Sequence, residues 1–171
     1  FGDGTLGQAI NAKLAPHASW PPDMTALDAD LATVRDMIRN TPLPDSADRI
    51  LTALNSWSST RKIRFRSSTN VEDASDFVGA GLYDSYSGCL GDDRDKDDTG
   101  PSACDSQEPQ ERGIKRAMSK VYASFYNRNA YLERLRRGVD ESKVGMAMLV
   151  HYSYPDSGEL ANGVATFTRG E

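Results

Sequence analysis

One segment near the middle of the chain constrains its fold more than any other: a β-type run that ends in arginine and hydroxyl residues. Residues 61–65 alternate polar and apolar side chains, as expected for a strand, and deliver Arg66 into the run Ser67-Ser68-Thr69. Arg64 lies two residues earlier, on the same face of that strand. Because a strand-end arginine offers fixed, bidentate donors to phosphate oxygens, the segment predicts a polyphosphate site. A structural turn would use the same common residue types and is the alternative.

A glycine-spaced loop follows the strand and favours the phosphate interpretation. Gly79, Ala80 and Gly81 come roughly a dozen residues after the arginine. Glycine lets backbone N–H groups approach phosphate oxygens closely, so strand and loop together can form a phosphate site without a Walker motif.

The order of these residues resembles the ATP-binding domain, also called the PEP/pyruvate-binding domain, of the pyruvate,water dikinase and pyruvate,phosphate dikinase superfamily. The match begins with Arg66-Ser67-Ser68, continues with Glu72-Asp73, and ends in a Phe-x-Gly-x-Gly loop. Residues 120–131 resemble the family's Val-Trp-Ala-Ser helix, and residues 144–151 and 161–166 resemble its next β-hairpin. The resemblance is collinear and runs from about Ile50 to the end of the chain.

This resemblance implies an α+β fold: part of an ATP-grasp-like nucleotide-binding domain with a mixed or antiparallel sheet and packed helices. The implied ligands are ATP and Mg²⁺, with the metal ligands outside this chain. The implied activity is that of an ATP-dependent phosphotransferase fragment, inactive when isolated. In such enzymes the phosphoryl group passes to a carrier histidine on another domain, and then to pyruvate or another acceptor.

The resemblance also assigns roles to individual residues. Arg66 matches the arginine that reaches the transferring phosphates and is the predicted catalytic residue, and Arg64 is a predicted assistant. The other predicted phosphate-binding residues are the hydroxyls of Ser67 and Ser68, the lid Gly79-Ala80-Gly81, and the later hydroxyls of Thr166 and Thr168. Glu72 and Asp73 are interpreted as acceptors that brace the loop. The resemblance places the magnesium carboxylates in a later segment, so we expect no metal ligand in this chain.

Two other classes of function stay open. One is a non-catalytic nucleotide-sensing module that retains the fold. The other is a protein-interaction module that docks a partner through its acidic segment at residues 92–98. The family's early glycine-rich Lys-Gly strand is not evident. Gly2, Gly4 and Gly7 fit a G-x-G-x-x-G pattern, but no strand precedes them, which favours a flexible terminus.

Length and charge narrow the choice of partners. The chain has 171 residues and a net charge of −5, which argues against nucleic-acid and membrane-surface roles. No apolar run approaches the ~20 residues of a membrane span. We expect a flank at residues 1–45, with one helix and the character of an incomplete lobe, before the ATP-binding domain at residues 46–171. The chain starts and stops like a piece of a longer protein.

Apolar spacing predicts the helices. Asp23 can cap a helix whose apolar positions are spaced by three and four residues, and Ser46 can cap a second helix. One long helix is expected from about residue 110 to 137, with a solvated basic end and Gly138 as its terminating residue. Residues 144–152 and 160–168 are expected to form a hairpin.

The remaining polar features suggest a loop rather than a site. Residues 91–111 lack apolar periodicity and are predicted to form an exposed, flexible acidic insertion. Their acidic residues do not have the spacing of a calcium-binding loop. Cys89 and Cys104 are either two separate reduced thiols or a disulfide at the base of this insertion. The first interpretation favours the cytoplasm and the second an exported parent. His17 is expected in an exposed loop and His151 at a strand end.

Overall fold

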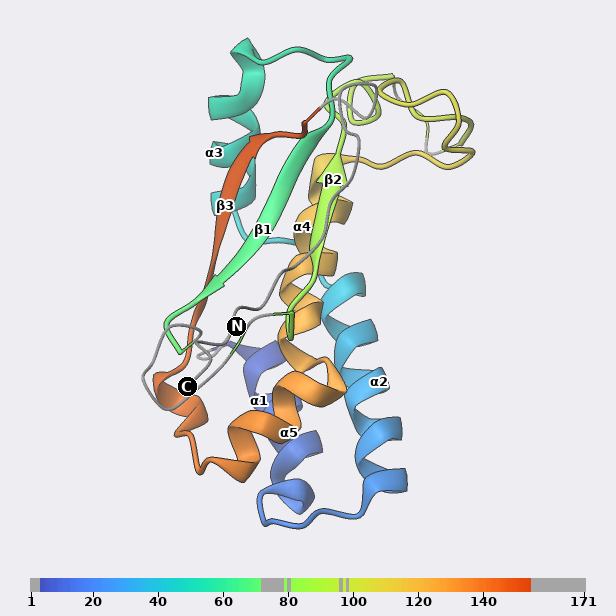
Figure 1. The fold of residues 1–171 in the computed structure, drawn as a ribbon. Coiled ribbons are helices and arrows are strands. Elements are labelled where there is room, and N and C mark those ends of the chain that lie inside the picture. The colour runs from blue at the N-terminus through green and yellow to red at the C-terminus, as the bar shows by residue number, and fades with distance from the viewer. Residues whose placement is uncertain (1–3, 72–78, 80, 96, 98, 155–171) are drawn as a thin grey trace, which may run out of the picture.

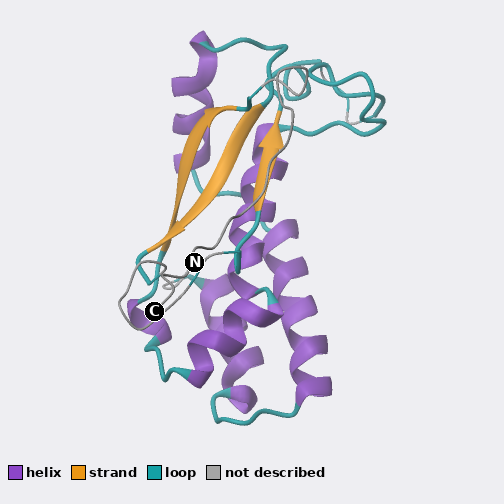
Figure 2. Cartoon of the chain, viewed as in Figure 1, coloured by secondary structure: helices purple, strands orange, loops and turns teal. Residues whose placement is uncertain are grey.

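A three-stranded antiparallel sheet with helices on one of its faces forms the core of the molecule (Figures 1 and 2). The structure is a computed structural model and describes residues 4–71, 79, 81–95, 97 and 99–154. The strands are β1 (Ile63–Thr69), β2 (Ser85–Gly88) and β3 (Met146–Tyr152), in the order β2-β1-β3. The predicted α+β class and the antiparallel sheet are confirmed.

The central strand β1 follows from its alternating sequence. Ile63 and Phe65 are fully buried, whereas Arg66, the next residue, is exposed. Burying a side chain such as Phe65 stabilises the fold by about 1.5–3 kcal/mol. The largest buried side chains of this first core come from β1, from the loop after β2, and from helix α4 (Ile114–Ala123): Ile63, Phe65, Leu90, Ile114, Met118 and Val121. Helix α3 (Ser46–Ala53) adds the buried Ala47 and the partly buried Ile50 and Leu51 to the same core.

A second core joins the N-terminal helices to the C-terminal half of the chain. Helices α1 (Thr5–Leu14) and α2 (Met24–Asn40) pack with α5 (Arg128–Arg136) and the end of α4. Asp23 caps α2 as predicted, because its side chain accepts hydrogen bonds from the backbone N–H groups of Thr25 and Ala26. The four apolar positions of α2 are all completely buried: Leu27, Leu31, Val34 and Ile38. The described part of residues 1–45 thus contains two α-helices where one was expected, and α1 starts at Thr5, within the glycine pattern for which a flexible terminus was expected.

The prediction of one long helix between residues 110 and 137 is wrong. Helix α4 ends at Ala123, a 3₁₀ turn covers Ser124–Tyr126, and α5 starts at Arg128 after the extended residue Asn127. The break leaves backbone carbonyls without helical partners, and two arginines bind them. Arg134 donates to the Phe125 carbonyl at 2.9 Å and Arg35 to the Tyr126 carbonyl at 2.8 Å. Gly138, at φ 62°, terminates α5 as predicted.

Three short 3₁₀ helices complete the described secondary structure outside this break. They are η1 (Ala15–His17), η2 (Leu54–Ser56) and η4 (Glu141–Lys143). The expectation of an exposed His17 is wrong: its side chain is buried, with Nε2 3.0 Å from a carboxylate oxygen of Asp30. The predicted second strand of the C-terminal hairpin, at residues 160–168, lies outside the described residues.

The acidic segment at residues 91–111 is largely exposed but anchored at several points, which differs from a simple exposed insertion. Asp92 is buried, and its carboxylate accepts hydrogen bonds from the backbone N–H groups of Ala103 at 2.8 Å and Arg112 at 2.6 Å. Cys89 and Cys104 form a disulfide, so of the two interpretations the structure has the cross-link at the base of this segment. Within the described residues, no helix combines the length and apolar content needed to cross a membrane.

Candidate functional site

The Arg-Ser-Ser segment lies within strand β1 rather than in a loop after it. The strand extends to Thr69, so the prediction that it ends before Arg66 is wrong. Alternation along the strand places Arg64, Arg66 and Ser68 on the face opposite Phe65. Ser67 lies on the same face as Phe65 and is half-buried. The structure thus separates the two predicted serines: Ser68 shares a face with the arginines, and Ser67 does not.

The face that carries Arg66 is open among the described elements. The described helices α3 and α4 pack on the other side of the sheet, as Figure 1 shows. Arg66 is flanked in register by Ser85 of β2 and Leu149 of β3. The side chain of Leu149 is 59% exposed, which indicates that no described side chain covers this area. A rigid strand therefore presents a guanidinium group on an accessible surface, where it can bind an anion.

Arg64 has a different environment from Arg66 although both lie on one face. Its guanidinium donates a hydrogen bond to Ser87 Oγ at 3.3 Å, and Ser87 Oγ lies 3.3 Å from Ser153 Oγ. The partner residue in register on β3 is His151, which lies one residue before the end of the strand, close to its predicted place. The guanidinium of Arg64 is thereby directed toward β2.

The glycine loop is described at Gly79 and Gly81, whereas Ala80 lies outside the described residues. Gly81 has φ 78°, a left-handed conformation that glycine adopts without strain. The backbone N–H of Leu82 donates to the carbonyl of Gly79 at 3.1 Å and closes a turn. Thr166 and Thr168, the predicted later hydroxyls, also lie outside the described residues, as do Glu72 and Asp73.

A buried arginine, which the sequence did not single out, fixes the exit of this loop. Arg134 is completely buried and donates to Tyr83 Oη at 3.3 Å. It also forms an ion pair with Glu141 at 2.6 Å and lies over the ring of Phe125, 3.9 Å from its centroid. The expectation of a solvated basic helix end is wrong for this residue.

The loop exit has a second anchor on the helical layer. The backbone N–H of Asp84 donates to Ser124 Oγ at 3.0 Å, and Ser124 is itself buried at the end of α4. These contacts hold the segment between the glycine loop and β2 at a fixed position. They give the loop a rigid end from which to approach a ligand on the sheet.

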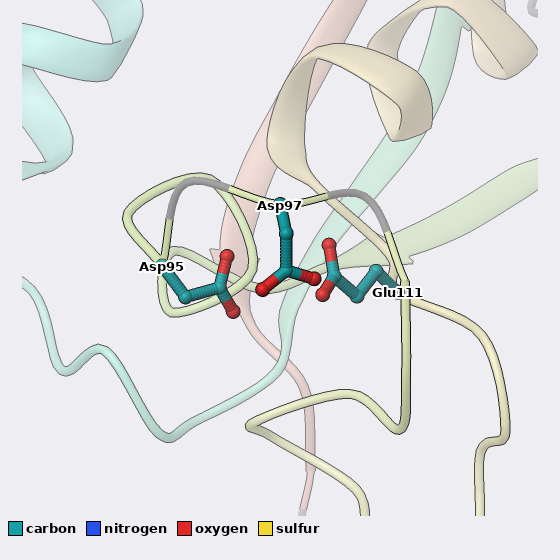
Figure 3. Close-up of side chains that lie close together, drawn as sticks. All are labelled: Asp95, Asp97 and Glu111. Atoms are coloured by element: carbon teal, nitrogen blue, oxygen red, sulfur yellow. The ribbon is translucent and has the colours of Figure 1, made fainter.

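Three carboxylates of the acidic segment lie close together: Asp95, Asp97 and Glu111 (Figure 3). Oxygen atoms of the three side chains lie within 4.8 Å of one another. Burial, followed by the charges of Asp95 and Asp97, raises the pKa of Glu111 to about 7. Hydrogen bonds from the backbone N–H and the hydroxyl of Thr99 lower the pKa of Asp97. The oxygen atoms of the three carboxylates have the chemistry of a hard-cation site.

Comparison with known proteins identifies one family. The family model described as the pyruvate phosphate dikinase AMP/ATP-binding domain matches residues 2–169 of the chain. No curated protein matches the chain. The matched region includes the glycine loop, strand β1 and the N-terminal helices α1 and α2.

Proposed function

Since this chain belongs to the family of pyruvate phosphate dikinase AMP/ATP-binding domains, we propose that it supplies the ATP-binding portion of a dikinase-like phosphotransferase. The observation that carries this proposal within the family is the exposed position of Arg66 on the open face of a rigid strand. An arginine on a strand can offer a fixed, bidentate set of donors to phosphate oxygens, which supports this role for Arg66 within the family. The proposal extends to the fold, which we assign to the ATP-grasp type.

The residues on this face fit the phosphates of ATP. The guanidinium of Arg66 would offset the charge spread over the transferring phosphoryl oxygens, and Ser68 adds a hydroxyl donor on the same face. Backbone N–H groups of the Gly79-Ala80-Gly81 loop would approach the phosphates from the other side. When bound, Mg²⁺ would neutralise phosphate charge, and its carboxylate ligands are assigned to a part of the parent protein outside this chain. The phosphoryl group would pass to a carrier histidine, also outside this chain, and then to pyruvate or another acceptor.

A titration with Mg-ATP followed by backbone-amide NMR tests this proposal. We expect chemical-shift changes at Arg66, Ser68, Gly79 and Gly81, with weak affinity because the site is partial. In Arg66→Gln the dissociation constant should rise about tenfold, because a charge-assisted hydrogen bond contributes about 1.5–3 kcal/mol.

Arg128→Gln is the matched control. It removes the same charge from an exposed position on α5, where Arg128 pairs with Asp28 at 3.2 Å. Its affinity for Mg-ATP should equal that of the unchanged chain. Shifts confined to residues away from β1 and the glycine loop, or equal affinity in Arg66→Gln, would reject the assigned site.

A further inference from the structure

Asp95, Asp97 and Glu111, here called the carboxylate cluster, converge on one space although they come from opposite ends of the acidic segment (Figure 3). Asp95 and Asp97 lie in the first part of the segment, and Glu111 lies at its end, shortly before α4. Oxygen atoms of the three side chains lie within 4.8 Å of one another. Two oxygen atoms that bind the same Ca²⁺ at about 2.3–2.6 Å are at most about 5 Å apart, so separations of this size suit the ligands of one ion.

The side chain of Glu111 is buried without a partner that would offset its charge. Glu111 is 8% exposed, and Figure 3 shows its carboxylate directed toward the carboxylate of Asp97. No described amine, amide, guanidinium or hydroxyl group donates a hydrogen bond to that carboxylate, whereas the backbone carbonyl of Glu111 accepts from Arg116 at 2.7 Å. Because a buried carboxylate normally has a cation or a hydrogen-bond donor beside it, this side chain has the environment of a cation ligand.

Other carboxylates of the same segment are neutralised by the protein itself. Asp105 forms an ion pair with Lys62 at 3.1 Å, and Glu108 forms one with Arg112. Among the residues that the structure describes, no lysine, arginine or histidine forms an ion pair with a member of the carboxylate cluster. Negative charge is therefore concentrated where the described cations do not offset it, and a bound divalent cation would relieve the repulsion.

Hydrogen bonds hold the cluster in place and leave oxygen atoms available to an ion. The backbone N–H and the hydroxyl of Thr99 both donate to Oδ1 of Asp97, at 3.0 and 3.2 Å. Oδ2 of Asp97 has no donor in the described part of the chain and can bind a cation. The buried carboxylate of Asp92 accepts from the backbone N–H of Arg112, the residue after Glu111, and so fixes the end of the segment that carries Glu111.

We propose that the carboxylate cluster binds a divalent cation of the calcium class. Ca²⁺ accepts several oxygen ligands in irregular geometry, whereas Mg²⁺ requires nearly octahedral geometry and retains several waters, so three carboxylates on a loop favour Ca²⁺. The ligands of an EF-hand lie within about twelve consecutive residues, whereas Glu111 follows Asp97 by fourteen residues. Spacing along the chain therefore did not predict this site, and no metal ligand was expected in this chain.

The cation site is separate from the proposed nucleotide site. The glycine loop leads into β2 at Ser85, which lies opposite Arg66 in the sheet. The acidic segment follows the other end of β2, where Gly88 lies opposite Ile63. The ion bound by the carboxylate cluster is therefore distinct from the Mg²⁺ that would accompany ATP, and its binding requires no nucleotide.

A titration of CaCl₂ into the chelator-treated chain tests the proposal, followed by backbone-amide NMR at pH 8 without nucleotide. This pH lies above the pKa of about 7 of Glu111, so that carboxylate is mostly ionised. We expect chemical-shift changes at the amides of Asp95, Asp97 and Glu111, with a dissociation constant of about 0.1–1 mM, the range of calcium sites in extracellular modules. In Asp97→Asn and in Glu111→Gln the dissociation constant should rise at least about tenfold, because each variant loses a charged ligand.

Glu108→Gln is the matched control. It removes one carboxylate from the same segment, but Glu108 pairs with Arg112 and lies outside the carboxylate cluster, so the affinity for Ca²⁺ should be nearly unchanged. Circular dichroism checks the fold of every variant, and the exposed Asp95→Asn should also weaken binding about tenfold if Glu111→Gln alters the fold.

Three results would count against this site. Absence of shifts at about 10 mM CaCl₂ would overturn the proposal, because calcium sites of this class bind at lower concentrations. Unchanged affinity in both Asp97→Asn and Asp95→Asn would also overturn it, since the ion would then bind elsewhere. Tighter binding of Mg²⁺ than of Ca²⁺ would reject the calcium class.

Discussion

The two faces of strand β1 use neighbouring residues in opposite ways. Phe65 is fully buried against the helices, whereas Arg66, one residue later, is exposed on the open face. One side of the strand therefore stabilises the fold and the other side is available to a ligand. Because alternate side chains of a strand point to opposite faces, a ligand-facing side chain can be substituted without removing a side chain from the core.

Substitution of the buried Phe65 should have the largest effect on the free energy of unfolding. Phe65→Ala should lower the free energy of unfolding by about 3–5 kcal/mol, because it removes a buried ring and leaves a cavity. Urea denaturation measures this loss, and Phe65→Leu should cost less than about 1.5 kcal/mol as a milder change. Arg66→Gln, on the other face, should change the free energy of unfolding by no more than about 0.5 kcal/mol. Equal losses at both positions would contradict the separation of roles.

Substitution of the buried Arg134 should have a somewhat smaller effect on the free energy of unfolding. This variant compares a structural cation with the ligand-facing Arg66. Arg134→Met should destabilise the protein by about 3 kcal/mol, since Glu141, Tyr83 and the Phe125 carbonyl lose a shared donor. Thermal or urea unfolding measures the change. Arg136→Met, at an exposed position two residues later, is the control and should be nearly neutral. If both variants behave alike, the hydrogen bonds of Arg134 do not stabilise the loop exit.

The smallest effect concerns Glu111, a carboxylate that belongs to neither face. Its pKa in the folded protein is raised from 4.5 to about 7, so the folded state holds a proton that the unfolded chain releases. Stability from this group is therefore fully present below about pH 4.5, decreases as the pH rises toward about 7, and is then constant. Glu111→Gln should remove this dependence, and the variant should gain stability relative to the unchanged protein between about pH 5 and about pH 8. Parallel stability curves for the two proteins would contradict the raised pKa.

Local patterns predicted more of the fold than of the site. The cap at Asp23, the apolar stripe of α2 and the terminating Gly138 depend on residues close in sequence, and the structure has each of them. The break between α4 and α5 was missed, because the carbonyls that it exposes are bound by Arg35, about ninety residues away, as well as by Arg134. Such a long-range contact leaves no trace in the local periodicity.

In the candidate site, too, local motifs identified single residues, whereas features that depend on long-range pairing were missed. The motif identified Arg66 and the glycines, and the roles proposed for them stay predictions. The bounds of the strand were misjudged, because a run rich in serine looks like a turn until its pairing with β3 is known.

The disulfide between Cys89 and Cys104 turns the intervening segment into a covalent ring. Arg94 lies in that ring and is exposed, so a protease that cleaves after arginine can reach it. A single cut there would divide the polypeptide without releasing either part, because the bridge still joins them. The nicked molecule would migrate as one species in a denaturing gel until a thiol reductant separated it into two fragments.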